Sequence, residues 1–170
     1  MKHVWLWFCL LSPLWVAAEV FTAKVTYVSD GDTLWVSTKG MPARKLRLLG
    51  LDAPEICQTG GVASRDALRQ WVGQHTVQVT VKSQDQYGRG LARVRIDSQD
   101  VGALMVASGQ AWSSRWHGRL GSYAQQEARA RANALGVFAN PAAELPRDFR
   151  KRVGSCYVRL SNGHLKLKTL

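Results

Sequence analysis

Between residues 20 and 96 the chain alternates apolar and polar side chains with a period of two, and this alternation constrains the fold more than any other feature. The apolar positions are mostly β-branched or aromatic, and turns that contain Gly and Asp separate the runs, which is typical of half-buried strands. One segment differs: Ser64–Val72 has apolar residues at helical spacing, and Ser64 is a suitable N-cap. The predicted strands are Phe21–Val28, Thr33–Thr38, Lys45–Gly50, Val77–Lys82 and Leu91–Ile96.

After Ile96 the apolar period becomes helical. Asp100 can cap a short helix that runs through Ala107 and closes at Gly109, and we expect a longer helix from Ser122 to Leu135. Five strands with a helix between the third and the fourth follow the element order of an OB-fold barrel. We therefore predict an α+β fold: a five-stranded OB-fold barrel with about three helices. The periodicity supports the α+β class, and only the element order indicates the barrel.

The chain is strongly basic, with 23 Lys and Arg residues against 12 Asp and Glu residues and a formal net charge of +11. Such a charge favours a polyanionic partner, which is nucleic acid, an anionic membrane surface or an acidic polysaccharide. The length of 170 residues suits one domain, and the apolar fraction of 46% excludes a disordered, collagen-like or coiled-coil chain. A membrane-surface protein would need a basic amphipathic helix, and none is evident in the sequence.

Residues 1–18 have the features of a signal peptide. Lys2 precedes an apolar run over residues 4–11, and Val16 and Ala18 fit the two small-residue positions of a cleavage site. An uncleaved membrane anchor is the alternative, but the run is short for a span. We expect cleavage before Glu19, a periplasmic or secreted protein, and no stable membrane association after the signal is removed.

The expected cleavage removes Cys9 and leaves Cys57 and Cys156. A pair of cysteines in an exported protein favours a disulfide, and two unpaired buried thiols are the alternative. The two residues are too few, and wrongly placed, for a zinc site.

Residues 141–170 form a predicted basic C-terminal extension. The Asn-Gly pair at residues 162–163 favours a tight turn, so we expect a β-hairpin around it, with Cys156 at the base as its staple. The basic run Arg147–Arg152 is expected to be a solvated surface, or part of a track along which nucleic acid binds.

Four of the 12 acidic residues lie in two short turns, Asp30-Gly-Asp-Thr33 and Asp52-Ala-Pro-Glu55, and each turn borders a predicted strand. If both turns lie at one end of a barrel, several carboxylates come close together. Like charges at such a distance need a cation, and oxygen ligands suit a hard ion such as Ca²⁺ or Mg²⁺. The alternative is ordinary turn chemistry, since Asp and Gly favour turns for local backbone reasons.

Two arginines accompany these turns. Arg47 lies on the strand that leads into Asp52, and Arg89 lies in the turn Tyr87-Gly-Arg-Gly90 at the start of the last predicted strand. Metal-holding carboxylates, a spare carboxylate and guanidinium groups are the groups needed to hydrolyse a phosphodiester. The metal and the guanidiniums neutralise charge on the phosphoryl oxygens, while the spare carboxylate activates water.

Three segments of the sequence resemble the signature blocks of the staphylococcal nuclease (thermonuclease) family, in the family's order and at similar spacing. They are Asp30–Thr33, Arg47–Glu55 and Tyr87–Ala92. The resemblance continues through residues 111–112 and the segment Leu135–Phe138. It implies an OB-fold barrel over residues 19–140 and a nuclease that cuts single- and double-stranded DNA and RNA with little sequence preference.

The resemblance implies a metal site. Asp32 and Asp52 match the carboxylate ligands of the family's Ca²⁺, and Ala53 matches a residue that ligates through its main-chain carbonyl. Asp30 matches a carboxylate that lies near the metal without binding it directly.

The resemblance also implies catalytic roles. Glu55 matches the general base that acts on a metal-associated water, and Arg47 and Arg89 match the arginines that clamp the phosphate and stabilise the transition state. Two substrate-binding positions depart from the family, since Gln86 replaces a phosphate-binding lysine and Ser114 replaces a tyrosine. These departures concern substrate affinity and leave the metal ligands and the arginines intact.

Aromatic residues supply the remaining expectations. By resemblance, Tyr87 contacts a substrate phosphate and Trp112 offers a face on which a base stacks. Trp116 is equally suited to stacking and to core packing. Trp35 and Trp71 fit core positions better than stacking positions.

The sequence leaves two classes of function open: a Ca²⁺-dependent nuclease, and an OB-fold module that binds nucleic acid without catalysis. Degenerate copies of the family lose acidic or arginine positions, whereas this chain keeps all of them. We therefore favour an enzyme, and the resemblance favours a monomer. The retained positions are Asp32, Arg47, Asp52, Glu55 and Arg89.

Overall fold

The structure, a computed structural model, describes residues 18–73, 75–115, 117–119 and 121–169. The expected signal peptide, apart from Ala18, lies outside the described residues, and so does Trp116. Within the described ranges, we find no helix with the length and apolar character needed to cross a membrane.

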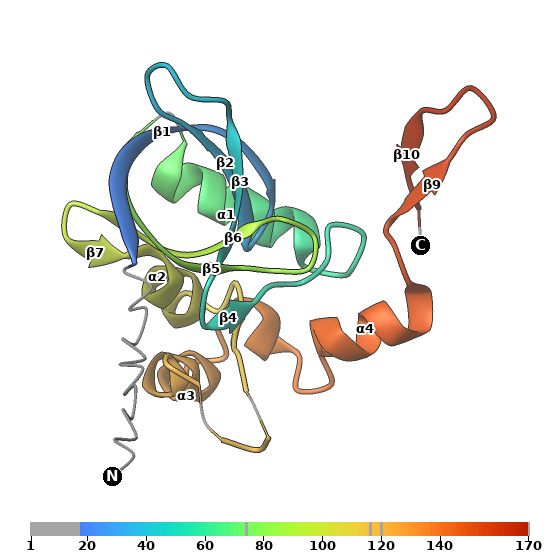
Figure 1. The fold of residues 1–170 in the computed structure, drawn as a ribbon. Coiled ribbons are helices and arrows are strands. Elements are labelled where there is room, and N and C mark those ends of the chain that lie inside the picture. Colours follow the sequence, from blue (N-terminus) through green and yellow to red (C-terminus); the bar gives the residue numbers. More distant parts are fainter. Residues whose placement is uncertain (1–17, 74, 116, 120, 170) are drawn as a thin grey trace, which may run out of the picture.

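Five strands close into a barrel (Figure 1), which confirms the predicted α+β fold and OB-fold architecture. They are β1 (Glu19–Asp30), β2 (Thr33–Ser37), β3 (Arg44–Leu48), β5 (Thr76–Gln84) and β6 (Gly90–Ile96). Their order is β3-β2-β1-β5-β6, and a parallel pairing of β3 with β6 closes the sheet. The long β1 pairs with β5 through its first half and with β2 through its second half. Its register shifts beside Tyr27 and Asp30, and such bulges bend a strand and redirect its side chains.

The barrel encloses the main hydrophobic core. On β5, Val77 and Val79 are buried while the residues between them lie outside, which is the period-two pattern that predicted the strand. Helix α1 (Gly61–Val72) packs against β1 and buries Leu68 and Val72. Trp71 does not join this core as expected: it is 39% exposed, because its helical neighbours occupy the buried face of α1.

The helical half of the domain follows the barrel. Asp100 caps α2 (Val101–Ala107) as predicted, and its carboxylate accepts a hydrogen bond from the Ala103 N–H. The next helix, α3 (Ala124–Ala132), is shorter than predicted, because Ala134 adopts a positive φ of 49° and ends it. The remaining short elements of this half are β4 (Leu51–Asp52), β7 (Gln99–Asp100), β8 (Trp112–Ser113) and the 3₁₀ turn η1 (Gly136–Ala139).

Two glycines, Gly109 and Gly136, allow a close contact between the segment after α2 and the start of η1. A Cβ on Gly136 would lie 2.2 Å from the Gly109 carbonyl oxygen, and both residues adopt positive φ. The two backbones therefore touch, and the Val137 N–H donates to the Gly109 carbonyl at 2.8 Å. Side chains at these positions would separate α2 from η1.

The C-terminal extension forms a helix and a hairpin (Figure 1). Helix α4 (Pro146–Val153) precedes the strands β9 (Tyr157–Arg159) and β10 (Leu165–Leu167), which pair around the predicted turn. The predicted disulfide is present: Cys57 and Cys156 are bonded, with their Cα atoms 5.5 Å apart. This helix corrects the expectation that residues 147–152 are only a solvated basic surface, because part of the helix is buried. Phe149 of α4 is buried with Ile56 beside the disulfide.

Candidate active site

The fold brings the two acidic turns to one end of the barrel. The first turn joins β1 to β2, and β2 pairs with β3 so that Thr33 lies opposite Arg47. The Ala53 N–H of the second turn donates to Asp32 Oδ2 at 3.2 Å, which connects the turns directly. The Thr33 hydroxyl donates to Asp32 Oδ1 at 2.9 Å. Asp32 is therefore a buried, fully oriented carboxylate, only 3% exposed.

Arg47 bridges the two turns. Its Nη1 donates to Asp32 Oδ1 and its Nη2 donates to Asp52 Oδ1, both at 2.8 Å. Burial opposes the charge on this guanidinium, but the charges of Asp32 and Asp52 outweigh that effect and raise the pKa of Arg47. The guanidinium is thus a fixed positive charge at this end of the barrel.

Asp30 lies beside this network in a less polar position. Burial, together with the nearby negative charge of Asp32, raises the pKa of Asp30 to about 7. Asp30 also accepts a hydrogen bond from the Asp32 N–H, at 3.1 Å. Two carboxylates this close form the kind of like-charge pair that a cation stabilises.

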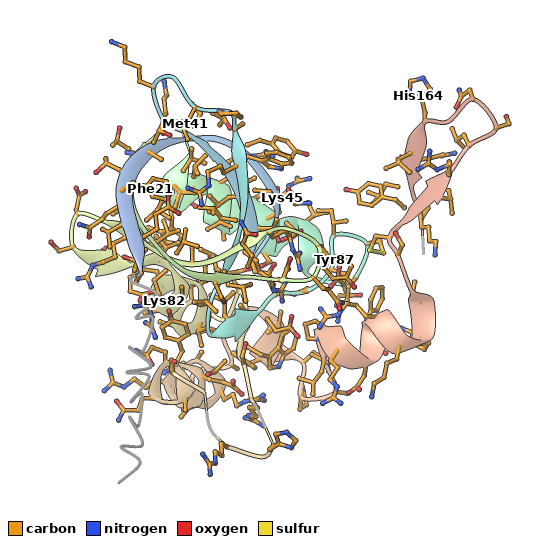
Figure 2. All side chains as sticks on the ribbon, viewed as in Figure 1. Phe21, Met41, Lys45, Lys82, Tyr87 and His164 are labelled. Atoms are coloured by element: carbon orange, nitrogen blue, oxygen red, sulfur yellow. A yellow bond between two sulfur atoms is a disulfide. The ribbon has the colours of Figure 1, made fainter. Side chains whose placement is uncertain are left out.

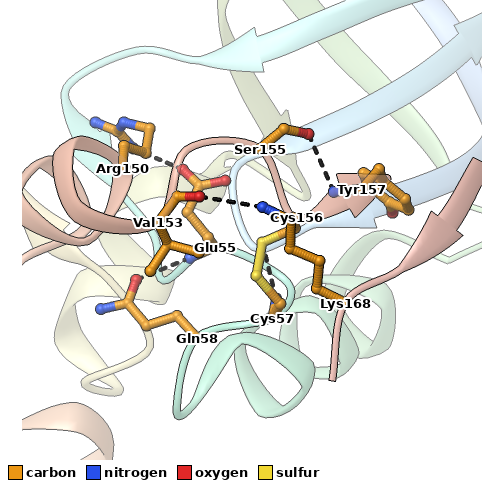
Figure 3. The surroundings of a disulfide bond; sticks show 9 residues. All are labelled: Glu55, Cys57, Gln58, Arg150, Val153, Ser155, Cys156, Tyr157 and Lys168. Carbon is orange, nitrogen blue, oxygen red and sulfur yellow. Dashed lines mark hydrogen bonds and ion pairs between the residues drawn. A yellow bond between two sulfur atoms is a disulfide. The ribbon is translucent and has the colours of Figure 1, made fainter. Parts of the chain in front are cut away.

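Glu55 and Asp52 share a third arginine, which the sequence analysis did not identify. Arg150 of α4 donates from Nη1 to Glu55 Oε1 at 2.7 Å and to Asp52 Oδ1 at 3.1 Å, and from Nη2 to Asp52 Oδ2 at 3.0 Å. Figure 3 shows the contact with Glu55 next to the disulfide. Burial opposes the charge of Arg150, but hydrogen bonds to the two carboxylates prevail and raise its pKa. One sequence signal could have located it: Cys156 must approach Cys57, which follows Glu55 by two residues.

Arg89 approaches from the turn between β5 and β6. Its Nε donates to Asp85 Oδ2 at 2.7 Å, and the same carboxylate accepts the N–H groups of Tyr87 and Arg89. The Arg89 guanidinium lies 5.4 Å from the centroid of the Tyr87 ring, which is 74% exposed. Figure 2 labels Lys45 and Tyr87, both on the side of the barrel that faces the C-terminal extension.

These groups surround one cleft of about 570 Å³. It brings together most of the predicted site residues, and Asp52 joins them through Arg47 and Arg150. Three guanidiniums and one ammonium group converge on it, which suits a phosphate anion. The lining residues are Asp30, Asp32, Lys45, Arg47, Ala53, Pro54, Glu55, Tyr87, Arg89 and Arg150.

Trp112 does not belong to this cleft, contrary to the expected stacking role. The side chain is 5% exposed and packs edge-on against Phe138, with ring centroids 5.8 Å apart. Its strand position explains this, because β8 places Trp112 opposite Asp52 and directs the ring into a cluster with Ala130. Because the Trp112 ring is almost fully buried and does not line the cleft, we do not carry that role forward.

The carboxylates fit Ca²⁺ in their chemistry, since oxygen atoms are its preferred ligands. The arrangement of these carboxylates in the structure, however, is not that of a metal-binding site. Among the residues that the structure describes, no three His, Cys, Asp or Glu side chains are grouped so as to hold a metal ion. Arginines bridge the carboxylates instead: Arg47 joins Asp32 to Asp52, and Arg150 joins Asp52 to Glu55. A cation at this place would have to replace some of these ion pairs.

Comparison with known proteins identifies a family model and several relatives that this chain resembles. A family model described as "Staphylococcal nuclease homologue" matches residues 45–140. An uncharacterized endonuclease of Haemophilus influenzae is 35% identical over 134 residues, which cover 79% of this chain and 75% of the relative. A micrococcal nuclease of Shigella flexneri is 33% identical over 142 residues, covering 77% and 81%. Protein ParB of Escherichia coli is 34% identical over 151 residues, covering 82% and 83%.

Proposed function

The chain belongs to the staphylococcal nuclease homologue family, and from this premise we propose that it is a Ca²⁺-dependent nuclease that hydrolyses DNA and RNA with low sequence specificity. Family membership supports hydrolysis of nucleic acid in general. The observation that supports the more specific proposal of phosphodiester hydrolysis is the cleft. The Glu55 carboxylate and the Arg47 and Arg89 guanidiniums line this one space. A base opposite paired guanidiniums is the arrangement that phosphodiester hydrolysis requires.

The proposed roles divide between the phosphate and the water. Arg47 and Arg89 bind the scissile phosphate and neutralise the charge that develops on its oxygens in the transition state. Glu55 accepts the proton of the attacking water. Tyr87, which is exposed at the mouth of the cleft, contacts a neighbouring substrate phosphate.

The proposed metal ligands are the side chains of Asp32 and Asp52 and the main-chain carbonyl of Ala53. Ca²⁺ bound there would supply a positive charge that polarises the phosphate and lowers the pKa of an associated water. The Asp30 carboxylate supports the site by accepting a hydrogen bond from the Asp32 backbone N–H. For Ca²⁺ to bind, Arg47 and Arg150 must release carboxylate oxygens, and substrate phosphate offers those guanidiniums a new partner.

A module that binds nucleic acid without cutting it is the second candidate, since the basic cleft alone accounts for binding. The retained set of carboxylates and arginines favours the enzyme. The described disulfide favours an oxidising compartment, which supports the proposed signal peptide and a periplasmic or secreted location; we propose that the protein is a monomer.

Digestion of DNA and RNA under controlled Ca²⁺ tests this function. Purified residues 19–170 should cut plasmid DNA, single-stranded DNA and RNA when Ca²⁺ is added, and the cutting should stop with excess chelator and return when Ca²⁺ is restored. Cutting that persists in chelator would remove the metal from the proposal. Binding without cutting at any Ca²⁺ concentration would favour the non-catalytic module.

A further inference from the structure

A second cavity of about 480 Å³ adjoins the proposed active site. The two spaces lie side by side, because four residues line both of them: Asp30, Lys45, Glu55 and Arg150. The far walls of the second cavity come from two parts of the chain, the outer face of the barrel and the segment that follows α4. Residues on those walls include Tyr27, Trp35, Ser155, Cys156 and Tyr157.

Three aromatic rings distinguish this cavity from the cleft. Tyr27 of β1 and Trp35 of β2 are register partners, and Lys45 of β3 is the partner of Trp35 on its other side. Cross-strand partners share one face of a sheet, so these side chains form a row. The Lys45 Nζ lies 5.8 Å from the centroid of the Trp35 ring, and Tyr27 is 57% exposed. The sequence analysis expected Trp35 in the core, but the residue is half-buried in this row and does not belong to the barrel core.

The third ring, that of Tyr157, comes from the C-terminal extension. Tyr157 follows Cys156, whose disulfide to Cys57 attaches the chain beside Glu55 (Figure 3). Partial burial raises the pKa of Tyr157, and the neighbouring Tyr27 and Asp30 raise it further, which agrees with its place across the cavity from β1. With 42% of its surface exposed, the ring remains accessible.

We propose that this cavity binds an unpaired nucleobase of a single-stranded segment whose adjacent phosphate lies in the active-site cleft. The inference rests on the proposed nuclease function, because it places the base relative to the phosphate being cut. Aromatic faces stack on bases of any sequence, which suits an enzyme of low sequence specificity. Lys45 and Arg150, at the boundary between the two spaces, can hold the backbone that links base and phosphate. In a duplex the faces of each base are already stacked, so this cavity would favour single strands.

Equilibrium binding without cleavage tests the proposal. Residues 19–170, in excess chelator, are titrated against three fluorescent ligands of equal length: a single-stranded thymidine oligonucleotide, an abasic oligonucleotide and a duplex. Tyr27→Ala and Tyr157→Ala should each weaken binding of the thymidine strand by about fivefold to a hundredfold, while binding of the abasic strand and the duplex changes by less than about twofold. Both tyrosines are exposed, so their truncation should leave the fold intact.

Matched variants separate stacking from other effects. Tyr27→Phe and Tyr157→Phe keep the ring and should bind as the unaltered protein does. Trp71→Ala removes an exposed aromatic that lines neither space, and should change nothing. Near-ultraviolet circular dichroism of each variant verifies its fold.

The outcomes distinguish the two proposals. If the alanine variants bind the thymidine strand normally, or lose affinity for all three ligands equally, the base site is wrong. It is also wrong if the unaltered protein does not prefer the thymidine strand to the abasic one. If the base preference is present and depends on the rings but the protein never cuts with Ca²⁺, the nuclease proposal fails while the base site stands.

Discussion

The barrel domain and the C-terminal extension are held together by different means. The barrel domain has a continuous core of aliphatic side chains from every barrel strand and from α1 and α2. The described part of the extension has one small buried cluster, in which Phe149 and Cys156 pack against Ile56 of the barrel domain. Both strands of its hairpin are exposed along their whole length. The barrel is therefore expected to fold through burial of apolar surface, while the extension depends on its disulfide and a few contacts.

The two regions also contribute differently to the proposed chemistry. The family match ends at residue 140, before α4 begins. The residues proposed to bind metal and to catalyse belong to the barrel domain. The extension adds Arg150, which pairs with two of the same carboxylates, and Tyr157, which faces them across the neighbouring cavity. We infer that the barrel provides the reaction and that the extension adjusts access to metal and substrate.

The largest expected effect is a loss of catalytic rate when Glu55 of the barrel domain is substituted. Glu55→Gln removes the proposed base while keeping the shape of the side chain, so kcat should fall by about 10²–10⁴-fold because water is no longer deprotonated. Binding of nucleic acid should remain. Single-turnover digestion at saturating Ca²⁺ measures the rate, and anisotropy measures the binding.

A carboxylate of the extension provides the matched control. Glu144 pairs with Arg152, so Glu144→Gln makes the same chemical change at a comparable ion pair outside the cleft. It should leave kcat unchanged. Equal losses in the two variants would contradict the division between barrel and extension, and full activity of Glu55→Gln would exclude Glu55 as the base.

The same division explains what the sequence could predict. Barrel strands follow from a period-two pattern, and the acidic turns are short local motifs, so neighbouring residues largely determine both. Helix α4 has only eight residues and is rich in arginine, and its position depends on a disulfide partner 99 residues away. The contact of Arg150 with Glu55 therefore could not be derived from local pattern. The burial of Trp112 could not be predicted for a similar reason, since it depends on packing against Phe138.

Removal of the disulfide tests whether the extension depends on this bond for its attachment to the barrel domain. In the chain-entropy model, a closed loop of about 100 residues stabilises a protein by about 4–5 kcal/mol. For a chain of this size, loss of that constraint in a Cys57→Ser, Cys156→Ser double variant should lower Tm by about 8–15 °C. Thermal unfolding followed by circular dichroism measures the shift.

The activity of the double variant tests whether the reaction needs the attached extension. If the barrel carries the reaction, cleavage of a small phosphodiester that lacks a flanking base should persist below the new Tm. Preference for single strands should decline, because Tyr157 is no longer attached beside the cleft. Complete loss of small-substrate cleavage by a folded variant would show that the extension is part of the catalytic unit. An unchanged Tm would show that the disulfide does not stabilise the part of the protein whose unfolding is observed.

The smallest expected effect concerns Arg150 and metal affinity. Its guanidinium pairs with Asp52, a proposed metal ligand, and would compete there with a cation; the Arg150 side chain is 39% exposed, so solvent weakens the competition. Arg150→Ala should therefore tighten Ca²⁺ binding, by about threefold to tenfold, when calorimetry measures it without nucleic acid. Arg152→Ala removes an equal charge from the same helix, where the guanidinium pairs with Glu144, and it should have little effect. If Arg150→Ala weakens Ca²⁺ binding instead, the guanidinium organises the carboxylates for the metal, and the extension belongs to the metal site that we assign to the barrel. If both variants tighten binding equally, the effect comes from the overall charge of α4 and not from the contact with Asp52 and Glu55.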